Sequence, residues 1–172
     1  MLVLASTSLA HTHRIAAAIA GHARSGDLLV LGGEMGSGKT AFAQGFGAAL
    51  GIDEPITSPT FTLVHTYDLP APRQRTRFHH ADLYRLDRLA EVADLALGEL
   101  LEADGIVLVE WGDVVGSALG DHLEIRIVAD DPGNEEHRRI ELQARGRAWA
   151  QRWAALADAV AEWLDEEDHG AC

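Results

Sequence analysis

Hydrophobic residues along this chain switch between helical and strand-like spacing, which predicts an α/β fold. Residues 8–20 carry apolar side chains near helical spacing, and residues 28–31 form a short apolar run typical of a buried strand. A glycine-rich segment follows at once, and residues 40–50 then read as a helix closed by Gly51. The first half of the chain therefore predicts a helix followed by a strand–loop–helix unit.

The middle of the chain predicts a strand pair, a helix and a buried strand. Residues 60–67 and 76–82 alternate like strands on either side of a proline-containing turn, so they predict a hairpin. Residues 86–101 read as a helix, and residues 105–110 form a continuous apolar strand that ends in an acid. Parallel-type and hairpin-type strands together indicate a mixed parallel and antiparallel sheet.

The last third predicts another antiparallel pair and a terminal helix. Residues 123–129 and 137–144 flank a turn, and residues 149–164 form an alanine-rich helical pattern with three tryptophans near one stripe. We expect a C-terminal helix over about residues 147–165 and an acidic tail over residues 165–172. With 172 residues and no long linker, the chain is expected to form a single domain.

The glycine-rich segment matches the phosphate-binding pattern G-x-x-x-x-G-K-[ST]. Its residues are Gly33, Glu34, Met35, Gly36, Ser37, Gly38, Lys39 and Thr40. Glycines allow successive N–H groups to point at one anion, and the N-terminus of the following helix adds partial positive charge. Lys39, the single lysine of the chain, is expected to neutralise the outer phosphates, and Thr40 to bind Mg²⁺. The sequence predicts a P-loop NTPase-like three-layer sandwich.

Two carboxylates end apolar strands and are candidates for the metal and for catalysis. Glu110 follows a buried strand, where phosphate-loop proteins keep a second Mg²⁺ residue. Its alternative is a strand-end glutamate that faces solvent. Asp82 ends the preceding strand and is expected either to polarise water or to act as a helix N-cap. The spacing alone leaves both interpretations of Asp82 open.

Three further groups of residues are candidates for chemistry. Thr60 and Thr62 lie after the phosphate-loop helix, where hydrolases keep switch segments, although a turn entering a strand explains the segment equally well. The arginines of residues 73–77 form either a phosphate-clamping lid or a solvated loop. His79 and His80 are adjacent on a strand and should point to opposite faces, which argues against a shared metal.

Composition narrows the ligands and partners. The net charge of −13 disfavours direct binding to nucleic acid and favours a small nucleotide and protein partners. No apolar run has the length of a membrane span, and the one cysteine, Cys172, allows no internal disulfide, which suits the cytoplasm. The guanine-recognition motif Asn-Lys-x-Asp does not occur, so we expect adenine.

Four ordered blocks, residues 33–40, 58–64, 82–86 and 108–111, resemble the TsaE (YjeE) family of small bacterial ATPases. The resemblance covers roughly residues 5–145. It implies a P-loop fold, weak Mg²⁺-dependent ATP hydrolysis and work with the TsaB–TsaD synthase pair. The product that the resemblance implies is threonylcarbamoyladenosine at position 37 of tRNAs that read codons beginning with A, and tRNA is expected to be bound only through partners.

The same resemblance assigns roles to individual residues. Lys39 and Thr40 match the phosphate-binding and Mg²⁺-binding pair, Glu110 matches the second Mg²⁺ residue, and Asp82 matches an acid needed for activity. Ser8 and Arg138 match nucleotide contacts only by position. Two rival functions are a P-loop small-molecule kinase and a scaffold in which ATP gates assembly without required hydrolysis.

Overall fold

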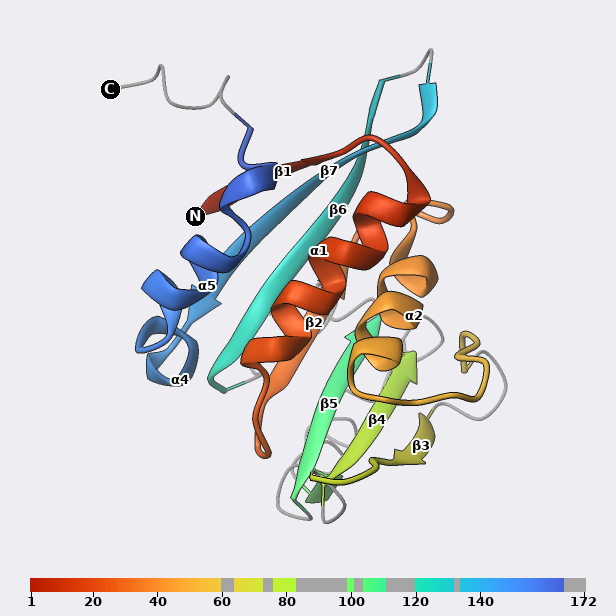
Figure 1. Cartoon of the computed structure of the whole chain (residues 1–172), viewed down its shortest axis with the longest axis vertical. Helices are drawn as coiled ribbons and strands as arrows, with labels where there is room; N and C mark the ends of the chain where they lie inside the picture. The colour runs from red at the N-terminus through yellow and green to blue at the C-terminus, as the bar shows by residue number, and fades with distance from the viewer. Residues whose placement is uncertain are drawn as a thin grey trace.

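The computed structural model describes residues 1–59, 64–72, 76–82, 99–100, 104–110, 120–131 and 134–165. Seven strands among these residues form one mixed sheet in the order β1-β7-β6-β2-β5-β4-β3 (Figure 1). The strands are β1 (Leu2–Ser6), β2 (Leu28–Gly32), β3 (Val64–Asp68), β4 (Arg77–Asp82), β5 (Gly105–Glu110), β6 (His122–Asp131) and β7 (Asn134–Arg145). The helices are α1 (Leu9–His22), α2 (Lys39–Ala49), α4 (Arg147–Ala150), α5 (Trp153–Ala159) and the 3-10 helix η3 (Ala161–Trp163).

The centre of the sheet is parallel, and its edges are antiparallel. Strand β2 pairs in parallel with β5 and β6, and β4 pairs in parallel with β5. Strands β3 and β4 form the antiparallel hairpin that the sequence predicted, and β6 and β7 form the second one. The predicted α/β class with a mixed sheet is therefore confirmed. The helix predicted over residues 86–101 lies almost entirely outside the described residues.

Both faces of the central strands are buried, which explains why their sequences read as continuous apolar runs. Leu29 and Leu31 belong to the core under α1 and α2, whereas Leu28 and Val30 belong to a second cluster with Val107 on the opposite face. Alternate residues of a strand point to opposite faces, so a strand that is buried on both faces carries apolar residues at nearly every position.

Helices α1 and α2 lie side by side across one face of the sheet (Figure 1). Ser8 caps α1 because its Oγ accepts a hydrogen bond from the His11 amide at 3.2 Å. On the inner side of α2, Phe42 and Phe46 are fully buried, and the ring of Phe46 lies 5.6 Å from that of Phe78 on β4. This packing fixes α2, and hence its N-terminus, over β4 and β5.

The sequence interpretation missed the edge strand β1. The sequence shows only a short apolar stretch here, yet Leu2–Ser6 pairs antiparallel with β7, from Leu2 opposite Leu142 to Ser6 opposite Arg138. The far side of β1 meets the end of the described chain, where the Asp165 amide donates to the Val3 carbonyl at 2.9 Å. A five-residue strand gives little periodicity of its own, and its partner lies far along the sequence.

The C-terminal segment forms three short helical pieces, α4, α5 and η3, rather than the one continuous helix that its alanine-rich pattern predicted. The backbone leaves helical geometry at Arg152 (φ −107°, ψ 3°) and again at Val160 (φ −108°, ψ 8°). These breaks let Trp149, Leu156 and Trp163 all reach the core. Tertiary packing therefore overrides the local helical preference. None of the helices in the described part of the chain is long and apolar enough to cross a membrane.

Candidate nucleotide site

The glycine loop joins the carboxyl end of β2 to the N-terminus of α2, as the sequence predicted. Gly33 has a φ of 139°, and a Cβ at this position would collide with the Ile127 carbonyl of β6. Gly38, the N-cap of α2, has a φ of 107°. Both conformations are strained for residues with a side chain, so the backbone path of the loop requires glycine.

The lysine lies at the centre of this loop. The side chain of Lys39 is only 5% exposed, and its Nζ donates to the carbonyls of Gly33 at 2.8 Å and Glu34 at 2.9 Å. A buried ammonium is costly unless it meets oxygen acceptors. The loop therefore wraps around the lysine in the way expected of a site built to present one cation to an anion.

A cavity of about 370 Å³ opens beside the loop, between residues 33–37 and residues 126–129 of β6. The exposed side chain of Met35 belongs to its rim, and the Ser37 hydroxyl near it is buried without a hydrogen-bond partner among the described residues. A buried hydroxyl that lacks a partner is costly, so a ligand that supplies a polar atom here would be favoured.

Glu110 and Asp82 lie at the carboxyl ends of neighbouring parallel strands and are direct register partners. Glu110 is 3% exposed, so the structure excludes the alternative in which it faces solvent. The Thr40 Oγ1, in the first turn of α2, lies 3.4 Å from Glu110 Oε1. The fold thus brings together the two residues that the sequence proposed as Mg²⁺ ligands.

Asp82 is nearly buried and accepts a hydrogen bond from the Ser58 Oγ at 3.1 Å. Ser58 belongs to the segment after α2. A second hydrogen bond holds this segment to α2, because the Gln44 side-chain amide donates to the Ile56 carbonyl at 3.1 Å. This contact connects one candidate catalytic acid to the start of the predicted switch segment. The switch residues themselves, Thr60 and Thr62, lie outside the described residues, as do the arginines at 73 and 75.

Arg138 and Ser8, which the sequence proposes as nucleotide contacts by position, both make hydrogen bonds in the structure. Arg138, on β7, donates from Nε to the Ser37 carbonyl at 2.7 Å and from Nη1 to the His137 carbonyl at 2.8 Å. Its guanidinium therefore braces the glycine loop from the side of β7. Ser8 acts as the helix cap described above.

The adjacent histidines point to opposite faces, as the strand geometry predicted. His79 Nδ1 hydrogen-bonds to the Thr66 Oγ1 at 2.9 Å, whereas His80 Nε2 lies 2.8 Å from Glu110 Oε1. Sequence reasoning considered His80 only as half of a metal pair and missed its contact with Glu110. The signal was available, because His80 and Asp82 are two residues apart on one strand and must share a face.

The part of the chain that the structure describes contains no group of three or more histidine, cysteine, aspartate or glutamate side chains that could hold a metal. This finding does not conflict with a nucleotide-linked Mg²⁺. Mg²⁺ in such sites takes one or two protein oxygens together with substrate phosphates and water.

Comparison with known proteins points to one family. A family model described as "Threonylcarbamoyl adenosine biosynthesis protein TsaE" matches residues 6–140. A Bacillus subtilis protein with the name "tRNA threonylcarbamoyladenosine biosynthesis protein TsaE" is 36% identical over 141 residues, covering 80% of this chain and 82% of its own. Proteins with the same name from Streptomyces coelicolor and Treponema pallidum are 37% and 39% identical over 132 and 114 residues. These matches cover 74% and 64% of this chain, and 86% and 79% of theirs.

A solved structure agrees with these matches in three dimensions. The crystal structure of Bacillus subtilis YdiB superposes with a TM-score of 0.71 at 28% sequence identity, over 94% of each chain. The structural similarity therefore covers nearly the full length of both chains. The family match ends at residue 140, so it leaves out the end of β7 and the helical pieces α4, α5 and η3.

Proposed function

This chain belongs to the TsaE family of tRNA threonylcarbamoyladenosine biosynthesis proteins, and we propose that it serves this pathway as a Mg²⁺-dependent ATPase of low intrinsic turnover. It binds MgATP at residues 33–40 and hydrolyses it to ADP and phosphate. The hydrolysis supports the TsaB–TsaD synthase pair, which forms the modified adenosine at position 37 of tRNAs that read codons beginning with A.

One observation carries this proposal: the oxygens of Thr40 and Glu110 lie 3.4 Å apart at the mouth of the glycine loop. An octahedral Mg²⁺ with metal–oxygen distances of about 2.1 Å holds adjacent oxygens about 3 Å apart. A hydroxyl and a carboxylate at this spacing therefore fit the coordination sphere of one Mg²⁺, directly or through a bound water. Oxygen ligands are also the ones that Mg²⁺ prefers.

The loop and its lysine supply the binding of the triphosphate. Backbone N–H groups of the glycine loop and the N-terminus of α2 present partial positive charge to the β-phosphate. Lys39 exchanges its contacts with the Gly33 and Glu34 carbonyls for phosphate oxygens, so a charged group that is already desolvated meets its intended partner. Thr40 and Glu110 would hold the Mg²⁺ ion, which would supply positive charge to offset the negative charge of the phosphates.

Asp82 is the acid we assign to the attacking water. It lies opposite Glu110 in the parallel pairing of β4 and β5, and Ser58 fixes its carboxylate. An ionised carboxylate in this position orients a water molecule and accepts its proton as the new bond forms. Two acids on adjacent strand ends thus take separate roles, one toward the metal and one toward water.

The acidic surface favours protein partners over direct binding to tRNA. With a net charge of −13, the chain repels a polyanion at long range, whereas MgATP is captured locally by the loop. We therefore place this protein in the cytoplasm as a partner of the synthase pair, which holds the tRNA. Slow turnover of the isolated protein follows if a partner completes the catalytic arrangement.

The decisive experiment measures MgATP binding by calorimetry and phosphate release with and without the TsaB–TsaD pair, with modified tRNA as a second readout. We expect binding by the isolated chain, slow phosphate release and stimulation by the pair. Transfer of phosphate to a small molecule would instead indicate the kinase alternative. Full tRNA modification by a variant that binds ATP but cannot hydrolyse it would indicate a nucleotide-gated scaffold.

A further inference from the structure

The most enclosed polar contact of the candidate site joins a histidine to the predicted metal-binding glutamate. His80 Nε2 lies 2.8 Å from Glu110 Oε1, and the two side chains are 0% and 3% exposed. A side chain as polar as histidine is buried at a cost unless its hydrogen bonds are made. The contact is therefore expected to have a role beyond filling space.

The sheet fixes the relative positions of the two residues. In the parallel pairing of β4 and β5, His80 lies opposite Leu108, so Glu110 is its diagonal neighbour two residues further along β5. Both residues belong to paired strands inside the sheet rather than to loops. The His80 ring also stacks on that of Phe78, with centroids 6.3 Å apart and planes inclined by 16°. The imidazole has little freedom to turn away from the carboxylate.

The chemistry of the pair gives the contact a direction. A glutamate that binds a cation is ionised, and an ionised carboxylate can only accept hydrogen bonds. His80 Nε2–H must therefore donate to Glu110 Oε1. The other ring nitrogen, Nδ1, is buried with no hydrogen-bond partner within the described ranges, so the donation to Glu110 is the only polar contact of this ring there.

The same carboxylate oxygen also lies 3.4 Å from the Thr40 Oγ1. Glu110 Oε1 thus sits between a rigid donor on β4 and the first turn of α2. A carboxylate held from one side keeps its orientation toward the other, which is how residues outside the coordination sphere raise metal affinity in many sites.

We infer that His80 is a positioning residue: it orients the Glu110 carboxylate toward the Mg²⁺ that accompanies bound nucleotide. This inference deepens the proposed function and rests on it. His80 does not itself touch nucleotide or metal. Loss of the His80 donor is expected to raise the Mg²⁺ concentration that nucleotide binding requires. The affinity for nucleotide without Mg²⁺ is expected to stay unchanged.

The chain offers a matched control in the preceding residue, His79. His79 is equally part of β4, is 2% exposed and makes its own side-chain hydrogen bond, to Thr66, on the opposite face of the sheet. A substitution of His79 removes a buried imidazole and one hydrogen bond without touching Glu110. Any effect that follows from weakening β4 in general should therefore appear equally in His79→Leu and His80→Leu.

The test titrates Mg²⁺ against a fluorescent N-methylanthraniloyl-ATP bound to the full chain, so the readout does not depend on hydrolysis. We expect His80→Leu to raise the Mg²⁺ concentration for half-maximal response by about 10- to 100-fold, the range seen when such supporting partners are removed. His79→Leu should leave it within about twofold of wild type. Affinity for the same nucleotide measured in EDTA should be unchanged in both variants.

A second pair of variants tests the same inference if leucine at position 80 prevents folding. His80→Gln carries a donor the same number of bonds from the backbone as Nε2, whereas the amide of His80→Asn is one bond shorter. Gln should retain wild-type Mg²⁺ dependence and Asn should lose it. Equal responses from Gln, Asn and wild type, or equal shifts in His79→Leu and His80→Leu, would overturn the inference. Failure of wild type to bind the nucleotide at all would instead overturn the proposed function.

Discussion

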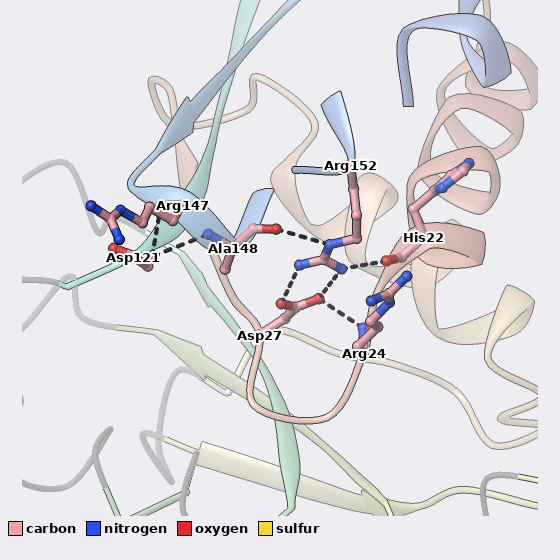
Figure 2. Close-up of polar contacts among 7 residues, drawn as sticks. All are labelled: His22, Arg24, Asp27, Asp121, Arg147, Ala148 and Arg152. Carbon is pink, nitrogen blue, oxygen red and sulfur yellow. Dashed lines mark hydrogen bonds and ion pairs between the residues drawn. The ribbon is translucent and has the colours of Figure 1, made fainter. Parts of the chain in front are cut away.

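Arg152 and Asp27 form a buried, two-pronged ion pair that joins the C-terminal helical pieces to the start of β2. The guanidinium donates from Nη2 to Asp27 Oδ1 at 2.6 Å and from Nη1 to Oδ2 at 2.7 Å (Figure 2). Nη1 also donates to the His22 carbonyl, Nε donates to the Ala148 carbonyl, and the group lies 4.2 Å from the Trp149 ring centroid. With Asp27 also accepting from the Arg24 amide at 2.7 Å, both charges are well satisfied.

Removal of Arg152 is therefore expected to destabilise the protein strongly. The side chains of Arg152 and Asp27 are 9% and 5% exposed, so Arg152→Met leaves a carboxylate buried without its counter-charge. Breaking a buried pair in this way costs about 3–5 kcal/mol. The free energy of unfolding, measured in urea by tryptophan fluorescence, should fall by about 3 kcal/mol.

The matched control is the exposed pair between Arg14 and Glu162, which also reaches the C-terminal segment. These side chains are 56% and 58% exposed, and exposed pairs contribute less than about 1 kcal/mol. Arg14→Met should therefore change the free energy of unfolding by less than about 1 kcal/mol. Equal losses from both variants would show that the Asp27 pair has no special role.

We expect substitutions of Lys39 and of Glu110 to have different effects. A hydrogen bond to a charged group contributes about 1.5–3 kcal/mol, so Lys39→Ala should weaken MgATP binding on the order of 100-fold. Lys39→Arg should not restore it, because a planar guanidinium is not equivalent to a compact ammonium within this loop. Glu110→Gln should retain nucleotide binding and lose Mg²⁺-dependent hydrolysis.

Calorimetry for binding and phosphate release for turnover separate these outcomes. The assignment of the site would be wrong if Lys39→Ala bound MgATP as tightly as the wild type. It would also be wrong for Glu110 if hydrolysis by Glu110→Gln kept its normal rate and Mg²⁺ requirement.

Most of the fold could be predicted because its central elements have strong local signals. The apolar run before Gly33 and the one before Glu110 each became a buried parallel strand, and the glycine loop fixed the position of the helix after it. The same logic placed Thr40 and Glu110 together, since parallel strands end at one edge and the helix begins there. At these residues the elements predicted from the sequence are the ones that the fold contains.

The remaining features depended on partners distant in sequence. Strand β1 pairs with β7, more than a hundred residues later, and a short strand lacks a periodicity that would identify it. The break in the C-terminal helix at Arg152 coincides with the ion pair of Arg152 with Asp27 and the burial of Trp149. The spacing of His80 and Asp82 shows that both side chains share one face of β4, but the choice of Glu110 as the acceptor also requires the pairing of β4 with β5.

Asp82 offers a test that separates catalysis from structure. Asp82→Asn keeps the shape of the side chain and an oxygen for the Ser58 hydroxyl, but it removes the negative charge. If Asp82 orients and deprotonates water, turnover should fall by about 100-fold or more, the usual contribution of such a group, while MgATP affinity stays within about threefold. Ser58→Ala, which retains the charge, should lower turnover far less. Normal turnover in Asp82→Asn would leave Asp82 with a structural role alone.

His79 is expected to make stability depend on pH. Burial, and after it the charge of Arg77, lowers the pKa of His79 below its ordinary value of 6.5. Below pH 6.5 the unfolded chain protonates this imidazole while the folded chain does not, so unfolding takes up a proton and the free energy of unfolding falls as pH falls. The loss continues down to the pKa of the folded state, with a slope of at most about 1.4 kcal/mol per pH unit for one proton.

Comparison with His79→Gln isolates this effect from that of the other histidines. The glutamine cannot titrate but keeps a polar group near Thr66. The free energies of unfolding of the two proteins, measured in urea at pH 7.5, 6.5 and 5.5, should differ by a constant amount above pH 6.5. Below it, the wild type should lose stability faster than the variant. Parallel curves through pH 5.5 would mean that the folded protein protonates His79 as readily as the unfolded chain does, and that the hydrogen bond to Thr66 does not require the neutral ring.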